Sequence, residues 1–173
     1  TGGQRLTQLL KATLVENGTV IRILDKKGKR QHPRVHLVPL IGKALALVHQ
    51  GRGGKLFGLT EDKQIDAALD ANKMLIKRIC TSMQADGISE KRFTPDAIRK
   101  TAETLLVAGL GISKDLRAQL QSHGLYGIQD RHYDKHNYMN EKRQVLESWG
   151  LYLDQLASDQ TNIITLGDRR TRA

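Results

Sequence analysis

The chain has 173 residues, enough for one domain or two small ones, so we expect a single hydrophobic core. Apolar residues make up 39% and charged residues 27%, a globular balance, and no apolar run approaches the roughly 20 residues of a transmembrane helix. A membrane-spanning protein is therefore excluded. Lys and Arg number 28 against 18 Asp and Glu, and the net charge of +10 favours nucleic acid as a polyanionic partner.

Cysteine and histidine usage excludes a disulfide-stapled scaffold. Cys80 is the only cysteine, so no internal disulfide can form, and no Cys/His spacing matches a zinc site. A reducing compartment fits such a chain best. We therefore expect a cytoplasmic protein with neither a metal nor another cofactor.

Few aromatic side chains are available to stack on bases. The chain has one Trp, four Tyr and two Phe, and a protein that binds single strands usually has more. Phosphate contacts from Lys and Arg suit the backbone of a duplex. The composition therefore favours double-stranded DNA.

The first forty residues predict one helix and a basic β-hairpin. Apolar residues at helical spacing predict a helix over about 4–14, which ends before the turn sequence Asn17-Gly18. Residues 19–24 and 34–40 are β-branched or alternating runs on either side of a turn-rich basic segment. They predict the two strands of the hairpin.

Three further segments have helical periodicity. Apolar residues predict helices over about 41–49, 61–84 and 138–157. The second of these carries its apolar side chains on one stripe, namely Ile65, Ala68, Leu69, Leu75, Ile76 and Ile79. The predicted fold class is thus mainly α with one small β-hairpin.

Capping residues place two more helices. Thr94 and Pro95 have the residue types of an N-cap and a first helical position, so they predict a helix over 95–108. Ser113 caps the next helix, which ends before Gly124, a residue suited to the left-handed position after a helix.

Candidate chemistry is carried by residues in a particular order: Arg5, the lysines of the hairpin turn, Arg99, His123 and Tyr133. Two guanidinium groups can hold the oxygens of a phosphodiester and stabilise the charge of its transition state without a metal. A tyrosine, with an ordinary pKa of about 10, can attack phosphorus when cations surround it, and a Lys or His can protonate the leaving oxygen. The order predicts phosphoryl transfer.

The same residues resemble the catalytic domain of phage-type integrases, the tyrosine recombinases. In that family an Arg follows a Thr-Gly turn, a Lys lies in a hairpin that ends in Val-Pro-Leu, a His-x-x-Arg box lies on a later helix, and a Gly-His motif precedes the nucleophilic Tyr. The matching segments are 1–5, 25–40, 93–106 and 120–143.

The resemblance implies the tyrosine recombinase catalytic-domain fold over residues 1–173. The sequence begins at Thr1 with neither an initiator Met nor the apolar region of a signal peptide. Together with the resemblance, this predicts a C-terminal catalytic fragment of an integrase. The family's N-terminal DNA-clamping domain and the first helices of its catalytic domain would then lie outside this chain, and the fragment alone could be inactive. Residues 132–143 look most like integrases of satellite phages and genomic islands, which implies the cytoplasm of a bacterial host.

By resemblance, the chain recombines DNA and integrates a mobile element at specific sites. Arg5 and Arg99 clamp the scissile phosphate with His123, and Tyr133 attacks to form a 3′-phosphotyrosyl bond. Strand exchange takes four protomers in this family, so we expect a homotetramer on double-stranded attachment sites. The apolar segment 162–166 either docks on a neighbour or forms an edge strand of its own protomer.

The hairpin supplies the remaining cations. The family lysine precedes a Gly, so Lys27 is the expected acid that protonates the leaving 5′ oxygen, with Lys26 and Lys29 as alternatives. Lys26, Lys29 and Arg30 are also expected to bind the DNA backbone. Simple solvation of a turn is the other interpretation of this charge run.

Two positions depart from the family pattern. Asp96 replaces the His of the box, and Gln8 stands where the family commonly has Glu. A carboxylate beside the scissile phosphate would repel it, whereas in the first turn of a helix it interacts favourably with the helix dipole. We expect this structural role for Asp96, with proton transfer near Tyr133 as the alternative.

Structural roles compete with the catalytic ones. Arg5 could be an exposed arginine on a frayed helix, Arg99 a partly buried side chain of an amphipathic helix, and His123 a cation at a helix C-terminus. Tyr126 and Tyr138 compete with Tyr133 as nucleophile.

A binding module without covalent chemistry is the alternative function. Residues 95–108, the Gly-Leu-Gly turn and residues 113–123 look locally like a helix-turn-helix for double-stranded DNA. Arg117 and Gln119 would then face a major groove. A metal-dependent nuclease is disfavoured, since acidic metal ligands do not cluster at helical spacing.

Overall fold

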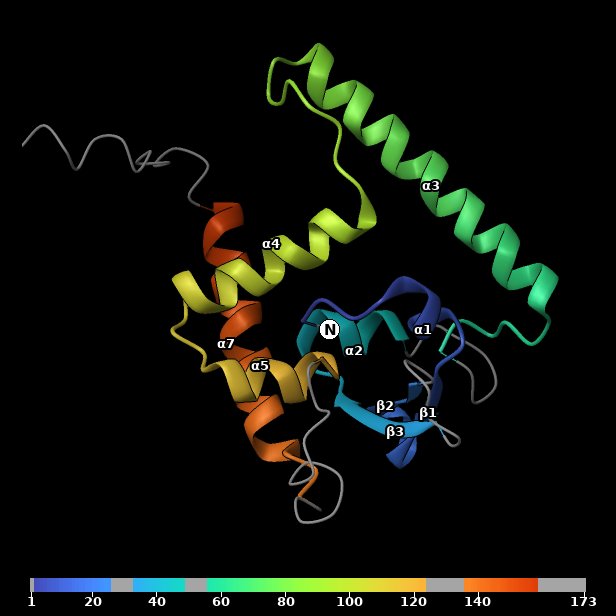
Figure 1. Ribbon diagram of the computed structural model, residues 1–173, viewed down its shortest axis with the longest axis vertical. Coiled ribbons are helices and arrows are strands. Elements are labelled where there is room, and N and C mark those ends of the chain that lie inside the picture. Colours follow the sequence, from blue (N-terminus) through green and yellow to red (C-terminus); the bar gives the residue numbers. More distant parts are fainter. Residues whose placement is uncertain (1, 26–32, 49–55, 124–135, 159–173) are drawn as a thin grey trace, which may run out of the picture.

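The computed structural model describes residues 2–25, 33–48, 56–123 and 136–158, and within these ranges the chain is mainly helical with one small sheet (Figure 1). This confirms the predicted fold class at that level. The elements in chain order are α1 (Leu6–Leu10), β1 (Thr13–Val15), the 3₁₀ turn η1 (Glu16–Gly18), β2 (Val20–Asp25), β3 (Arg34–Pro39), α2 (Gly42–Val48), α3 (Asp62–Ala85), α4 (Pro95–Ala108), α5 (Lys114–Gln121) and α7 (Met139–Ser158).

The sheet has three antiparallel strands in the order β1-β2-β3. The hairpin strands β2 and β3 agree with the predicted ranges, so that prediction is confirmed. Burial alternates along β2 after its first residue, and one face of the sheet is turned to the core.

The predicted first helix is wrong in its second half. Helix α1 ends at Leu10, and Thr13 to Val15 instead form β1, which pairs with β2. Thr13 and Val15 are β-branched and suit a strand, and the pairing with β2 outweighs the local helical spacing of the apolar residues.

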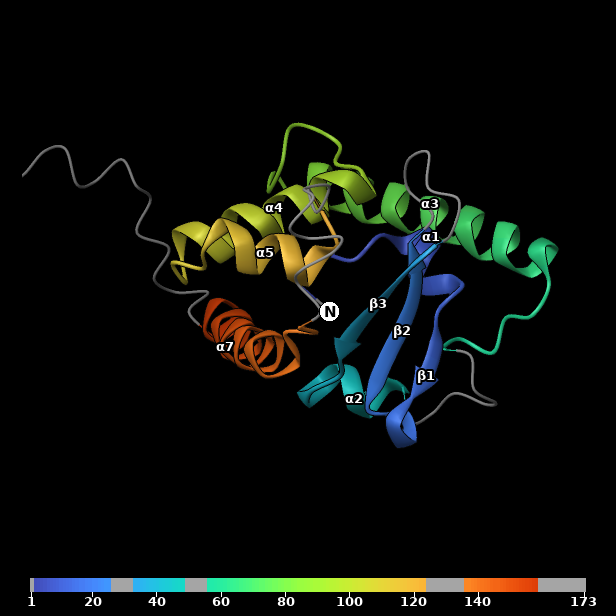
Figure 2. The same ribbon diagram turned by 60° about the horizontal axis from the view of Figure 1, so that its bottom comes forward.

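The core lies where the sheet meets α4, α5 and α7. Figure 2 shows these three helices grouped on the β3 side of the sheet, while β1 forms the far edge. The fully or nearly buried side chains of this core include Ile21, Ile23, Val38, Leu106, Leu120, Val145, Leu146 and Trp149.

Helix α3 is the longest helix and runs along the outside of the molecule (Figure 1). Its N-terminus has a capping box between Glu61 and Gln64. Ile65, Ile76 and Cys80 are buried, but Leu75 and Ile79 from the predicted stripe are 52% and 41% exposed. The helix is confirmed, and its predicted apolar stripe is only partly covered by the described residues.

The predicted caps of α4 and α5 are confirmed. Thr94 Oγ1 and Ser113 Oγ each accept a hydrogen bond from a backbone N–H of the following first turn, both at 3.3 Å. The end of α5 differs from the prediction, because the left-handed residue is Ser122 (φ 51°, ψ 47°). Gly124, which was expected there, lies outside the described residues. The last predicted helix is confirmed as α7.

Gly2 is a position at which the fold requires glycine. Its φ is +63°, and a Cβ added there would lie 2.7 Å from Leu120 Cδ2 in the core. We expect Gly2→Ala to lower the free energy of unfolding by about 1–3 kcal/mol, because the side chain overpacks the core and strains the backbone. Urea unfolding monitored by circular dichroism measures this.

Gly150 provides the matched control. It lies inside α7, and a Cβ added there meets no atom within 4 Å. Gly150→Ala is expected to raise the free energy of unfolding by about 0.5–1 kcal/mol through helix propensity. Equal effects of the two substitutions would contradict the assigned role of Gly2.

Candidate active site

The inner face of the sheet changes from apolar to charged along its length. The cross-strand pairs on this face are, in order, Ile21–Val38, Ile23–His36 and Asp25–Arg34. The last pair lies at the end of β2 and the start of β3, where the hairpin turn joins them. Asp25 is only 3% exposed, so polar groups are buried at this end of the sheet.

Side chains from three other segments hold the C-terminal end of α5. The Leu120 carbonyl accepts hydrogen bonds from Gln4 Nε2 at 2.6 Å and from His36 Nε2 at 3.0 Å. The Gln121 carbonyl accepts one from Arg99 Nη2 at 3.2 Å. The last carbonyls of a helix have no partner within the helix, so these bonds satisfy groups that burial would otherwise leave unpaired.

The N-terminal turn lies directly against this helix end. Gln121 Nε2 donates to the Gly2 carbonyl at 3.1 Å. A Cβ added to Gly3, whose φ is +86°, would lie 2.9 Å from Gln121 Nε2 and 3.7 Å from Arg99 Cγ. Only a glycine allows this close approach, which brings the start of α1, and with it Arg5, next to Arg99.

Arg5 and Arg99 form a pair of like charges. Burial lowers the pKa of Arg99, and the positive charge of Arg5 lowers it further. Nη2 of Arg99 binds the Gln121 carbonyl, whereas Nη1 is buried and has no hydrogen-bond partner in the described part of the chain. A buried donor beside a second guanidinium is suited to an oxyanion.

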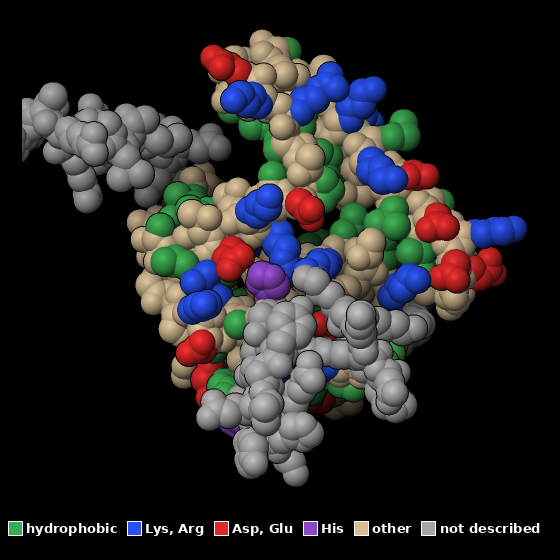
Figure 3. All heavy atoms as spheres, in the orientation of Figure 1, with side chains coloured by type: hydrophobic (Ala, Val, Ile, Leu, Met, Phe, Trp, Pro, Cys, Tyr) green, Lys and Arg blue, Asp and Glu red, His purple; other side chains and the backbone are tan. Residues whose placement is uncertain are grey.

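His123 follows immediately after this helix end. Its backbone N–H donates to the Ala118 carbonyl at 3.0 Å, and its side chain is exposed. It lies two residues after Gln121, whose carbonyl Arg99 binds. Figure 3 shows Lys and Arg side chains gathered beside a histidine near the centre of one face. Three of the predicted site residues thus belong to one region of the fold.

Asp25 is a buried residue of this region that the sequence analysis did not single out. Its Oδ1 accepts a hydrogen bond from Gln8 Nε2 at 3.1 Å, and its Oδ2 accepts one from Ser122 Oγ at 2.9 Å. The strand alternation could have revealed it, since Asp25 follows Ile21 and Ile23 on the inner face.

The remaining predicted residues lie outside the described residues: Lys26, Lys27, Lys29, Arg30 and Tyr133. Their roles stay predictions. The structure does describe the residues that precede their segments, which are Asp25 before the hairpin turn and His123 before the segment of the tyrosine.

Asp96 occupies the position that the structural interpretation predicts. It is the second residue of α4, in the first turn, and is exposed. Its negative charge raises the pKa of Arg99. An acidic residue in this turn interacts favourably with the helix dipole and with the nearby guanidinium.

The alternative of a helix-turn-helix needs Arg117 and Gln119 on an open surface. Arg117 instead donates to the Ile112 carbonyl at 3.2 Å and to Glu103 Oε1 at 3.1 Å. Gln119 is 6% exposed and accepts a hydrogen bond from Arg34. Both side chains are bound within the protein, so neither is presented to a groove of DNA.

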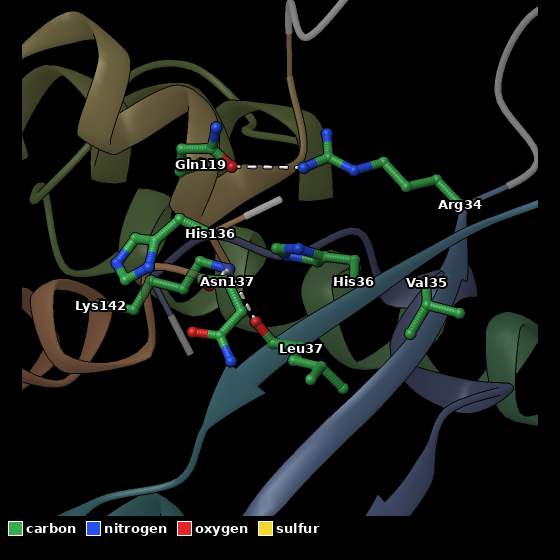
Figure 4. Close-up of a pocket in the computed structure, with 8 residues that line it drawn as sticks. All are labelled: Arg34, Val35, His36, Leu37, Gln119, His136, Asn137 and Lys142. Atoms are coloured by element: carbon green, nitrogen blue, oxygen red, sulfur yellow. Dashed lines mark hydrogen bonds between the residues drawn. The ribbon is translucent and has the colours of Figure 1, made fainter. Parts of the chain in front are cut away.

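A polar cavity of about 210 Å³ lies between β3, α5 and the start of α7 (Figure 4). Lys142 is 3% exposed there and donates to the carbonyls of Leu37 and Asn137, both at 3.0 Å. Burial, and then the charge of Arg34, lowers its pKa to about 8. Lys142 thus links the start of α7 to β3 by hydrogen bonds. This link lies close in sequence to the end of the segment that holds Tyr133.

No protein-family model matches the chain, nor does any curated protein or solved structure. Within the described ranges, no cluster of three or more His, Cys, Asp or Glu side chains could hold a metal ion. No helix in those ranges combines the length and apolar character needed to cross a membrane.

His36 predicts a specific pH dependence of stability. Burial, and then the charge of Lys142, lowers its pKa from 6.5 to about 3, so the ring is neutral and donates from Nε2 to a carbonyl. Between pH 6.5 and 3 the unfolded state binds more protons, so stability falls as the pH is lowered. From pH 6.5 to 5 we expect a loss of about 2 kcal/mol.

Urea unfolding of wild type and His36→Gln at both pH values tests this. Glutamine keeps an N–H donor for the Leu120 carbonyl but does not titrate, so the variant should lose less stability over this interval. His123→Gln changes an exposed histidine and should behave like wild type. An unchanged pH dependence in His36→Gln would show that other groups cause it.

Proposed function

We propose that this chain is the catalytic domain of a tyrosine recombinase, which cuts and rejoins double-stranded DNA to integrate a mobile element such as a phage or genomic island. The convergence of Arg5 and Arg99 at the end of α5 carries this proposal. These residues are far apart in the sequence, yet they lie close enough for the charge of one to lower the pKa of the other. Two neighbouring guanidiniums repel one another, and an anion bound between them relieves that repulsion.

A phosphodiester is an anion that suits this pair. Its two non-bridging oxygens accept hydrogen bonds from guanidinium groups, and they gain negative charge when a nucleophile attacks phosphorus. Arg99 Nη1 has no hydrogen-bond partner in the described part of the chain, and such an oxygen would supply one. In this proposal His123, two residues after Gln121, supplies a third donor. This stabilisation requires no metal or cofactor.

The covalent step assigned to Tyr133 and Lys27 is a transesterification. The Tyr133 hydroxyl gives its proton to solvent water as its oxygen bonds to phosphorus, and the bond from phosphorus to the 5′ oxygen breaks. Lys27 gives the leaving 5′ oxygen a proton. The 3′-phosphotyrosyl bond keeps the energy of the phosphodiester, so the 5′ hydroxyl of another strand can reverse the step.

Duplex DNA at attachment sites is the proposed substrate, bound by a homotetramer in the cytoplasm of a bacterial host. The net charge of +10 supports binding to a polyanion. Lys26, Lys29 and Arg30 would add contacts to the backbone beside the scissile phosphate.

A covalent trapping experiment tests the nucleophile. Duplexes tiled across the DNA that flanks the coding gene, each nicked to prevent religation, are incubated with the intact protein and separated in SDS. Wild type should form an SDS-stable adduct, and Tyr133→Phe should form none. Arg99→Lys is expected to slow adduct formation about 10²-fold, because it removes a guanidinium donor.

Tyr138→Phe is the matched control, since Tyr138 immediately precedes α7 and is not the expected nucleophile. An adduct in Tyr133→Phe would assign the nucleophile elsewhere. Duplex binding by wild type without any adduct on its own flanking DNA would instead favour a binding module.

Salt dependence tests the phosphate contacts separately from the chemistry. Affinity for a 30-base-pair duplex should fall by roughly 10²–10³-fold from 50 to 200 mM salt, as for about five phosphate contacts. Arg99→Gln should reduce the slope of log affinity against log salt by about one contact. Fluorescence anisotropy measures both quantities.

Arg22→Gln serves as the control for this experiment, because Arg22 is exposed on the outer face of β2. It should leave the slope close to that of wild type. Equal slopes in all three proteins would argue against a phosphate contact by Arg99.

A further inference from the structure

Asp25 connects the segments that hold the proposed catalytic residues. One of its oxygens accepts a hydrogen bond from Gln8, three residues after Arg5 on the first helix. The other accepts one from Ser122, the residue before His123. Asp25 itself ends β2 and directly precedes the hairpin segment of Lys27. Its carboxylate therefore lies at the junction of three parts of the candidate site.

The bond to Ser122 fixes the direction in which the chain leaves α5. Ser122 is in the left-handed region, with φ 51° and ψ 47°, which is unfavourable for a residue with a side chain. The hydrogen bond from its hydroxyl to a buried carboxylate offsets this strain. The conformation of Ser122 in turn sets the position of His123.

The charge of Asp25 acts on the same region. Arg34 lies directly opposite in the sheet. Burial and then Arg5 lower the pKa of Arg99, and the Asp25 carboxylate, after Glu103 and Asp96, partly offsets this lowering. A buried negative charge compensates the repulsion between the guanidiniums in a way that a neutral group of the same shape cannot.

We propose that Asp25 is a positioning residue for strand cleavage, whose buried carboxylate holds Arg5, Arg99 and His123 in the arrangement that binds the scissile phosphate. This role rests on the proposed recombinase function. Asp25 does not contact the substrate itself. It acts through Gln8 and Ser122 and through its charge.

Asp25→Asn removes the negative charge of this side chain and keeps its shape. The asparagine oxygen can accept the hydrogen bond from one neighbour, while its amide donates to the other, so both contacts can form. We expect duplex affinity within about twofold of wild type and adduct formation about 10- to 100-fold slower in single-turnover reactions, since misplaced catalytic groups affect the chemical step. Asp70→Asn removes the same charge from an exposed position on α3 and should cleave at the wild-type rate.

Moving the carboxylate from position 25 to position 8 tests whether the lost activity can be restored. In the double variant Gln8→Glu with Asp25→Asn, the new glutamate accepts a hydrogen bond from the new asparagine amide, and the asparagine oxygen accepts one from Ser122. The carboxylate is thereby restored one side chain away. We expect the double variant to form the adduct at least fivefold faster than Asp25→Asn, even if that single variant folds poorly.

The outcomes separate the two proposals. If wild type forms the adduct and Asp25→Asn does so at the same rate, the positioning role is wrong and the recombinase function stands. If Asp25→Asn is slow and the double variant is no faster, the carboxylate has only a structural role. If wild type forms no adduct on its flanking DNA, the recombinase function fails, and the role of Asp25 fails with it.

Discussion

The candidate site depends on the carbonyl groups at the end of α5, which have no partner within the helix and are buried. Gln4, His36 and Arg99 satisfy them, and these side chains come from the N-terminal turn, the sheet and α4. Because an unsatisfied buried carbonyl costs about 1–3 kcal/mol, each bond stabilises the fold. The same bonds place Arg99 beside the turn that leads to Arg5. Folding and assembly of the site thus rely on the same contacts.

The free energy of folding alone does not explain why positively charged side chains gather near the end of α5. Arg5, Arg99, Arg34 and Lys142 bring positive charge into a partly buried region. Burial lowers the pKa of Arg99 and of Lys142, and the charges of Arg5 and Arg34 lower them further. Replacing buried charges with apolar residues is often neutral or stabilising, so a cluster of cations at the end of a sheet is costly for a purely structural purpose. An oxyanion bound at the surface of this cluster would recover that cost. The energetics therefore agree with a phosphate as ligand.

Local sequence signals predicted the parts of the structure that local forces determine. Thr94 and Ser113 cap their helices as expected, and the alternating runs form the hairpin. Thr13 and Leu14 were assigned to a helix and not to β1, because their pairing with β2 is not encoded in their own spacing. The proximity of Arg5 and Arg99 was expected from the resemblance to tyrosine recombinases, whereas the contacts of Asp25 depend on three segments meeting in space. Lys27 and Tyr133 remain predictions from sequence.

The hydrogen bond between Asp25 and Ser122 joins two residues that lie just before the segments of Lys27 and Tyr133. Asp25 directly precedes the hairpin segment that holds Lys27, and Ser122 and His123 directly precede the segment that holds Tyr133. The starting points of these two segments are therefore joined by one buried bond. Under the proposed function, Lys27 and Tyr133 act as proton donor and nucleophile on the same phosphate, and such groups must be held a fixed distance from one another. The buried bond between Asp25 and Ser122 fixes the residues from which both segments start, which is consistent with that requirement.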